Sequence, residues 1–228
     1  MLKERYQRNH NTINEDELPI LNGSKICVVG CGGLGGHIID MLVRVGIGNL
    51  TVVDGDVFVE SNLNRQLLSK ESNLGKSKAQ EAGKYVHLIN SQVELTIHDQ
   101  YLNDDNAYNI IEGCNVVIDA LDNVKSRLLL EKACFVKKIP LIHGAIGGWY
   151  GQVAVVLPGS HLLTKLYSED SGEGEERILG NPSFTPANIA SIQVAECIKY
   201  ILNKESALTN SILQIDLLTD SFDIVSIE

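Results

Sequence analysis

The chain has 228 residues, 44% of them hydrophobic, and a formal net charge of -10 at pH 7. This length and composition fit one sizeable folded domain rather than a disordered chain. The acidic balance, without a long basic run, argues against nucleic acid or an anionic membrane as the main partner. No apolar stretch reaches the roughly 18 residues of a membrane helix, and no signal-peptide core follows Met1, so we expect a cytoplasmic protein.

Five cysteines are scattered along the chain, at positions 27, 31, 114, 134 and 197. None belongs to a C-x-x-C pair, so the sequence predicts no thiolate site for zinc. Most of them sit within apolar runs, which favours reduced core residues, and Cys197 falls on the apolar stripe of a predicted helix. Cys31 is different because it lies in a glycine turn, where we expect a partly exposed thiol.

The first strongly patterned stretch follows a polar N-terminal arm, predicted to be helical, at residues 1–21. Residues 26–29 form an apolar run typical of a buried strand, and residues 36–45 have the apolar spacing of a helix. Between them Gly30, Gly32 and Gly35 form a G-x-G-x-x-G motif in the context that nucleotide binding requires. Glycines let the backbone approach a phosphate, and a helix start offers N–H groups to an anion. The alternative is a turn that only packs the helix on the strand.

Asp54 favours the nucleotide interpretation. Residues 50–54 predict a second strand that ends at this carboxylate, about 20 residues beyond the glycines, where ribose hydroxyls are bound in such folds. NAD-linked hydride transfer is the default function for this pattern. The residues that follow argue against it.

Residues 55–66 are irregular and polar, whereas an NAD-binding unit usually enters its next helix directly. Asn62, Arg65 and Gln66 in this segment suggest a triphosphate site, since the planar guanidinium of arginine matches phosphate oxygens. Lys76 and Lys78 then lead into a helix that reaches about residue 90. A lysine in the first turn opposes the helix dipole, so either an anion lies nearby or both lysines are solvated surface residues.

The next predicted elements are a strand at 93–97, a helix at 104–111, a buried strand at 115–120, a helix at 123–137 and a strand at 139–145. Asp122 and Asn123 follow the buried strand, at the sheet edge where open α/β folds bind ligands. Asp122 can hold Mg²⁺, which prefers oxygen ligands and phosphates, and it can also cap the following helix. His143 is the only histidine near this predicted site, and we interpret it as structural.

The C-terminal part contains a predicted strand at 151–157, a helix at 186–202 and a terminal strand pair at 211–218 and 222–227. Residues 158–183, acidic and rich in Gly and Ser, predict a long loop of the mobile or functional kind. The predicted fold class is therefore α/β: a Rossmann-like, mostly parallel sheet with helices on both faces and antiparallel strands towards the C-terminus. We expect residues 1–228 to form a single domain.

Several ordered motifs resemble the HesA/MoeB/ThiF family, bacterial relatives of the ubiquitin-activating enzymes. They are RYQR at 5–8, GCGGLG at 30–35, GNL at 48–50, VDGD at 53–56, SNLNRQ at 61–66, GKSK at 75–78, and LDN at 121–123 followed by Arg127. The core resemblance covers about residues 1–157. The order and spacing of several motifs make it specific, whereas the glycine motif alone is weak.

The resemblance implies an ATP-binding adenylyltransferase domain with residues 158–183 as its crossover loop. Such enzymes activate the C-terminal Gly-Gly carboxylate of a ubiquitin-like sulfur-carrier protein of the ThiS/MoaD type as an acyl-adenylate, releasing pyrophosphate, in thiamin or molybdopterin biosynthesis. The implied cofactors are ATP and Mg²⁺, and the implied assembly is a homodimer; no sulfur donor is indicated. Many members carry two C-x-x-C zinc pairs and a crossover-loop cysteine. This chain has neither, so we expect no zinc site and no thioester on that loop.

Roles for single residues follow from the same resemblance. Arg8 looks like an arginine that reaches the partner's phosphates across the dimer, Asp54 would bind the ribose, and Asp122 would hold Mg²⁺. The predicted catalytic residues are Arg8, Arg65, Lys78 and Asp122. The predicted nucleotide-binding residues are Gly30, Gly32, Gly33, Gly35, Asp54, Asp56, Ser61, Asn62, Arg65, Gln66, Lys78, Asp122 and Asn123.

Three alternatives stay open. The first is that the chain is a family cousin that adenylates a small-molecule or tRNA-borne carboxylate, although the net charge of -10 disfavours tRNA. A non-catalytic nucleotide-binding subunit would not need Arg8, Arg65, Lys78 and Asp122 together. An NAD-dependent oxidoreductase fits least well, because of the polar insert after Asp54.

Overall fold

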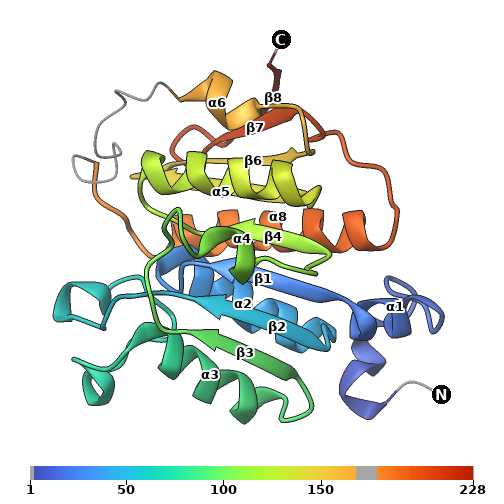
Figure 1. Cartoon of the computed structure of the whole chain (residues 1–228), viewed down its shortest axis with the longest axis vertical. Helices are drawn as coiled ribbons and strands as arrows, with labels where there is room; N and C mark the ends of the chain where they lie inside the picture. Colours follow the sequence, from blue (N-terminus) through green and yellow to red (C-terminus); the bar gives the residue numbers. More distant parts are fainter. Residues whose placement is uncertain (1–2, 168–178, 228) are drawn as a thin grey trace.

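One sheet of eight strands runs through the molecule in the order β3-β2-β1-β4-β5-β6-β7-β8 (Figure 1). The computed structural model describes residues 3–167 and 179–227. Strands β1 to β5 are parallel, and β6, β7 and β8 are added antiparallel, which confirms the predicted fold class. The strands are β1 Lys25–Val29, β2 Asn49–Val53, β3 Glu94–His98, β4 Val116–Asp119, β5 Leu141–Gly147, β6 Tyr150–Val156, β7 Ser211–Asp216 and β8 Ser221–Ser226.

Helices cover both faces of the sheet. Residues of α2, α3 and α8 share one hydrophobic core with alternate strand residues such as Val28 and Ile118. Residues of α4, α5 and α6 share a second core with the intervening positions, such as Val29 and Val117. The central strands are buried on both sides, which is why they read as continuous apolar runs. The helices are α1 Glu17–Gly23, α2 Gly33–Val45, α3 Lys78–Ile89, α4 Ala107–Ile110, α5 Val124–Lys137, α6 Leu162–Leu166 and α8 Phe184–Ile201.

The order of the parallel strands creates a switch point between β1 and β4. The chain builds β1, β2 and β3 outward on one side and then returns to place β4 on the other side of β1. Connections that leave the two strands in opposite directions open a crevice above their carboxyl ends, where open α/β sheets bind ligands. The fold therefore places a binding site above β1 and β4.

Two predicted helix starts differ from the structure. The helix predicted at 104–111 is only Ala107–Ile110, because the side chain of Asn103 accepts hydrogen bonds from the backbone N–H groups of Asp105 and Asn106 and holds a turn there. Asp122 does not cap α5; the side chain of Asn123 does, accepting from the N–H of Ser126 at 2.9 Å. The Asp122 carboxylate is thereby left for another role.

The N-terminal arm is anchored at the far end of α2 from the glycine turn. Its first segment is a 3-10 helix, η1 Glu4–Asn9, rather than an α-helix. Tyr6 is buried and its hydroxyl accepts from Asn90 at 3.0 Å, while Asn9 donates to the carbonyl of Val45 at the end of α2. Figure 1 shows the arm at the opposite end of the sheet from the carboxyl ends of the parallel strands.

The predicted long loop at 158–183 contains a short helix, α6. The carboxylate of buried Glu131 accepts from the N–H groups of Leu163 and Thr164 and so fixes the start of this helix. Residues 168–178 of the predicted loop lie outside the described residues. In the described part of the chain, no helix is both long enough and apolar enough to span a membrane.

Candidate functional site

An open cleft of about 280 Å³ lies above the switch point. It brings together residues from widely separated parts of the chain, from Val29 to Asn181. The lining members of the predicted set are Gly30, Gly32, Gly33, Asp54, Asp56, Arg65, Gln66, Lys78, Asp122 and Asn123. Two walls can be distinguished: one is built from residues 30–78, with the glycine turn, the acidic end of β2 and Lys78, and the opposite one is the β4–α5 loop.

The glycine turn combines two functions. Gly30 has φ +101°, and a Cβ there would lie 2.4 Å from the carbonyl oxygen of Ala120, while one at Gly35 would lie 1.8 Å from that of Gly30. These two glycines are required by packing, and Gly35 does not line the cleft. Gly32 and Gly33 do line it, at the start of α2, whose first turn has no side-chain cap. The N–H groups of this turn are therefore suited to an anion.

Asp54 is held at the end of β2 by two backbone donors. Its carboxylate accepts from the N–H of Cys31 at 2.7 Å and from that of Asp56 at 2.8 Å. Burial raises the pKa of Asp54 above its usual value, against the effect of these two hydrogen bonds. The side chain is thus oriented between the glycine turn and the cleft before any ligand arrives.

Cys31 does not have the partial exposure expected from its place in the turn. The side chain is buried, and its thiol lies 3.9 Å from the carbonyl oxygen of Val53. Burial raises the pKa of the Cys31 thiol well above its usual value, so it is a poor nucleophile. All five cysteines, including Cys197 as predicted, are buried.

Lys78 is buried and paired, which excludes the alternative of a solvated surface lysine. Its ammonium lies 3.0 Å from the carboxylate of Asp56, which also accepts from the hydroxyl of Tyr101 at 2.6 Å. Burial by itself raises the pKa of Asp56, but the hydrogen bonds from Tyr101 and Lys78 outweigh it and hold that pKa below its usual value. Lys76, in contrast, is exposed.

Arg65 stands at the rim of the same wall. Its guanidinium donates to the carbonyl of Ser61 and to the side chain of Asn64, both at 2.9 Å. Beside it, the side-chain oxygen of Gln66 is buried with no hydrogen-bond partner among the described residues. Such an atom favours a polar ligand in this part of the cleft.

Asp122 projects into the cleft from the β4–α5 loop. It is exposed, and one carboxylate oxygen accepts from the side chain of Asn123 at 3.2 Å. Within residues 3–167 and 179–227, no cluster of three or more His, Cys, Asp or Glu side chains could hold a metal ion. A single carboxylate beside a phosphate site nevertheless suits Mg²⁺, which is commonly held by one or two carboxylates, phosphates and water. The residues present fit the metal that the family resemblance implies.

Three predicted residues besides Gly35 do not line the cleft of this chain. Ser61 contributes its backbone carbonyl to Arg65, and buried Asn62 accepts from the N–H of Val59 at 3.0 Å. Arg8 is exposed in the N-terminal arm, at the other end of α2. Their proposed contacts with nucleotide stay predictions.

The cleft also contains residues that sequence reasoning did not single out, among them Gln100, Tyr101 and Asn181. Tyr101 follows β3, so its place after a parallel strand was a usable signal. Asn181 offers no such signal: it reaches the cleft from the segment before α8, where its carbonyl accepts from Asn64 at 3.0 Å.

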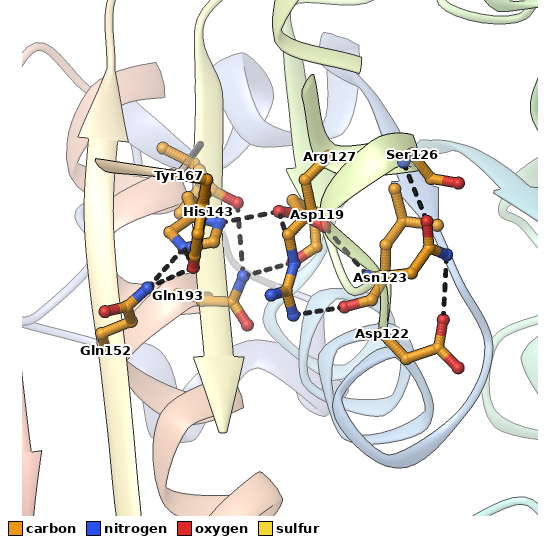
Figure 2. Close-up of polar contacts among 11 residues, drawn as sticks. Asp119, Asp122, Asn123, Ser126, Arg127, His143, Gln152, Tyr167 and Gln193 are labelled. Atoms are coloured by element: carbon orange, nitrogen blue, oxygen red, sulfur yellow. Dashed lines mark hydrogen bonds and ion pairs between the residues drawn. The ribbon is translucent and has the colours of Figure 1, made fainter. Parts of the chain in front are cut away.

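His143 does not line the cleft. It is fully buried and its Nδ1 lies 2.7 Å from the carboxylate of Asp119 at the end of β4 (Figure 2).

Comparison with known proteins gives a consistent result. A family model described as the ThiF family matches residues 6–228. The SAMP-activating enzyme E1 of Haloferax volcanii is 34% identical over 208 residues, which is 90% of this chain and 77% of that protein. The molybdopterin-synthase adenylyltransferase of Salmonella typhimurium is 32% identical over 207 residues, covering 89% of this chain and 82% of that protein. The adenylyltransferase and sulfurtransferase MOCS3 of Culex quinquefasciatus is 34% identical over 211 residues. The match covers 86% of this chain but only 46% of that protein.

Solved structures share the fold. Escherichia coli MccB with MccA-N7isoASN superposes with a TM-score of 0.85 at 20% identity, covering 98% of this chain and 71% of that chain. The E. coli tRNA N6-threonylcarbamoyladenosine dehydratase TcdA superposes with a TM-score of 0.75 at 25% identity, covering 88% of this chain and 95% of that chain.

Proposed function

The chain belongs to the ThiF family, and from this premise we propose that it is an ATP-dependent adenylyltransferase for a ubiquitin-like sulfur-carrier protein. The observation that supports this most directly is the convergence of Asp54, Arg65, Lys78 and Asp122 on one cleft at the switch point. Two relatives that this chain covers well are named SAMP-activating enzyme E1 and molybdopterin-synthase adenylyltransferase. The proposed pathway is thiamin or molybdopterin biosynthesis.

ATP would bind with its ribose at Asp54 and its phosphates along the start of α2. Arg65 and Lys78 supply two positive charges on the same side of the cleft, and Lys78 can exchange Asp56 for a phosphate oxygen because both partners line the cleft. Asp122 would hold Mg²⁺, which neutralises charge on the phosphates when bound. The buried oxygen of Gln66 would find a donor in the ligand or in ordered water.

The proposed reaction requires little from acid–base groups. A carboxylate oxygen of the carrier's C-terminal glycine forms a bond to the α-phosphorus, and the bond from that phosphorus to the bridging oxygen breaks. The electron pair leaves with pyrophosphate. The nucleophile is already ionised at neutral pH, so catalysis consists of alignment and of stabilising charge on the leaving group. Arg65 and Lys78 are the side chains placed for this.

We further propose that the acyl-adenylate passes directly to an external sulfur donor. All five cysteines are buried, and residues 168–178 of the crossover loop contain none. A reductant-sensitive enzyme–carrier adduct that disappears in a Cys197→Ala variant would contradict this. Stoichiometric zinc in the purified protein would contradict the separate expectation that the chain has no zinc site.

A homodimer would complete the site. Arg8 lies on an arm that is anchored away from its own cleft, so it is available to a partner's cleft. The proposed role is an arginine supplied in trans to the triphosphate, where a guanidinium fits phosphate oxygens.

The deciding experiment is ATP–pyrophosphate exchange by the purified protein with a panel of Gly-Gly-ended carriers. Exchange that depends on one carrier would establish adenylation and identify the partner together. ATP binding without exchange on any carrier would move the assignment to another carboxylate substrate or to a non-catalytic subunit.

One alternative has a specific observation behind it. This chain covers 95% of TcdA, a protein named as a tRNA N6-threonylcarbamoyladenosine dehydratase. The net charge of -10 weighs against a polyanionic substrate. Total tRNA in place of the carrier is therefore a necessary arm of the exchange assay.

A further inference from the structure

A buried polar network lies directly behind the loop that carries Asp122 (Figure 2). Asp119, at the end of β4, is fully buried, and its carboxylate oxygen Oδ2 lies 2.7 Å from Nδ1 of His143 on β5. The same oxygen lies 3.7 Å from Nε of Arg127, a buried residue of α5. The network therefore contains two groups of opposite charge and one imidazole.

The hydrogen bonds define the state of the imidazole. Burial lowers the pKa of His143 below its usual value, although Asp119 acts in the opposite direction, so the ring is neutral at pH 7. A carboxylate can only accept, so the proton of the neutral ring is on Nδ1 and Nε2 is an acceptor. On that side, the Tyr167 hydroxyl lies at 3.3 Å and the Gln152 amide nitrogen at 3.1 Å.

The same groups hold the residue that precedes Asp122. The backbone N–H of Leu121 donates to Oδ1 of Asp119 at 2.9 Å, and the carbonyl of Leu121 accepts from Nη2 of Arg127 at 2.6 Å. Both backbone polar groups of Leu121 are thus bound by members of the buried network. On the other side of Asp122, Asn123 caps α5 and donates to the Asp122 carboxylate.

The end of β4 is held from the opposite face as well. Pairing between β4 and β5 ends at Ile118 and Ile142, so Asp119 lies beyond the part of β4 that pairs with β5. The amide of Gln193, a buried residue of α8, donates to that carbonyl at 2.8 Å and to the carbonyl of Ile142 at 3.2 Å. The strand end from which the loop departs is therefore held on both faces.

Burial of an ion pair is not needed to build a sheet edge. Replacing such pairs with apolar side chains of similar volume is often neutral or stabilising. A network that holds both neighbours of a proposed metal ligand suggests a different benefit, since groups behind a metal ligand tune its orientation and affinity.

We propose that Asp119 and His143 are positioning residues that fix the orientation of Asp122 for a divalent cation bound together with ATP. His143 holds the Asp119 carboxylate, Asp119 and Arg127 hold Leu121, and Leu121 sets the direction of Asp122. This inference rests on the proposed function, because it takes Asp122 as the Mg²⁺ ligand.

The test measures metal binding rather than activity. Mn²⁺, as a paramagnetic substitute for Mg²⁺, is titrated into the full chain with a non-hydrolysable ATP analogue and followed by electron paramagnetic resonance. His143→Phe keeps an aromatic ring but removes the donor to Asp119, and His143→Asn keeps an N–H near the position of Nδ1. We expect His143→Phe to weaken Mn²⁺ binding about tenfold or more, and His143→Asn to stay within about threefold of wild type.

Two controls separate positioning from general damage. Asn73→Ala removes another buried polar residue, which contacts Leu68, Lys70 and Glu81 rather than the cleft, and should leave Mn²⁺ affinity unchanged. Affinity for the analogue without metal should stay within about threefold in every variant, because the positioning acts on the cation ligand. If His143→Phe does not fold, Asp119→Asn replaces it, with the same expected loss.

The outcomes are distinct. Unchanged Mn²⁺ affinity in a folded His143→Phe, or an equal loss in His143→Asn, would overturn the positioning role and leave the proposed function standing. A wild-type protein that binds the analogue but no Mn²⁺ would overturn the assignment of Asp122 and with it this inference. A protein that does not bind the analogue at all would overturn the proposed function itself.

Discussion

The two walls of the cleft differ in how their polar groups are used. On the wall built from residues 30–78, Arg65 is partly exposed and Lys78 shares a cleft-facing contact with Asp56. Behind the opposite wall, Asp119 and His143 are buried and bonded to each other. Groups that meet a ligand face the cleft, whereas groups that position others are enclosed behind it, and losing one partner there leaves a buried polar group unsatisfied.

The walls differ in origin as well. The first wall comes from a single stretch of the chain, residues 30–78, which contains the glycine turn, Asp54, Arg65 and Lys78. The buried network draws on β4, β5, β6, α5 and α8, together with Tyr167 after α6 (Figure 2). Changes to the side chains that face the cleft should therefore alter chemistry, and changes in the buried network should alter metal binding and stability.

The largest effect is expected at Asp122, on the wall formed by the β4–α5 loop. Asp122→Ala should lower carrier-dependent pyrophosphate exchange by roughly 10²- to 10³-fold, because charge on the leaving group is no longer neutralised by a held metal. The side chain is exposed, so the melting temperature should not change. Exchange close to wild type would remove Asp122 from the mechanism.

Lys78 and Lys76 offer a matched pair on the first wall. Lys78→Ala should reduce exchange by about 10²-fold, whereas Lys76→Ala, an exposed residue outside the cleft, should change it less than about twofold. Initial rates at saturating ATP measure both. Equal losses in the two variants would indicate a general electrostatic effect. Arg65→Ala is expected to behave like Lys78→Ala. Unchanged exchange in this variant would exclude Arg65 from the mechanism.

Arg8 tests whether the first wall is complete within one chain. Arg8→Ala should be inactive by itself. Mixed in equal amounts with Asp122→Ala, it should recover about a quarter of wild-type exchange, since half of randomly formed dimers are mixed and each mixed dimer has one intact site. No recovery after subunit exchange would favour a site built within a single chain.

The buried network should make stability pH-dependent. The folded-state pKa of His143 is lowered, first by burial, so the unfolded chain binds the additional proton more readily. The free energy of unfolding that His143 contributes is therefore fully present above pH 6.5, the ordinary histidine pKa. It decreases as the pH falls below 6.5, by up to about 1.4 kcal/mol per pH unit.

The titratable and charged groups that face His143 are those of Asp119, Arg127, Glu131 and Tyr167. Urea unfolding between pH 7 and 5 measures the slope, which His143→Asn should reduce. An unchanged slope would show that the acid sensitivity arises elsewhere.

Ser61 is expected to give the smallest effect. Its carbonyl, not its hydroxyl, accepts from Arg65, so Ser61→Ala should leave exchange within about twofold of wild type. A clearly raised KM for ATP would show that the hydroxyl contacts the nucleotide, in line with the predicted nucleotide-binding role of Ser61.

The sequence by itself determined the parallel sheet, the glycine turn and the first wall of the cleft. These depend on local properties: apolar runs that must be buried, a positive φ at Gly30, and charged residues placed directly after strands. The same local reasoning placed Asp122 at the correct edge, although it offered Asp122 as a cap of α5, which is capped by Asn123.

Only the tertiary structure decided what surrounds each side chain. Cys31 is buried because β2 and the glycine turn close over it, and Lys78 is paired because Asp56, 22 residues earlier, folds back beside it. His143 acquires its role from Asp119 on a neighbouring strand, and no periodicity in the sequence encodes that contact. Burial and pairing depend on residues distant in the chain, whereas strands and turns depend on near neighbours.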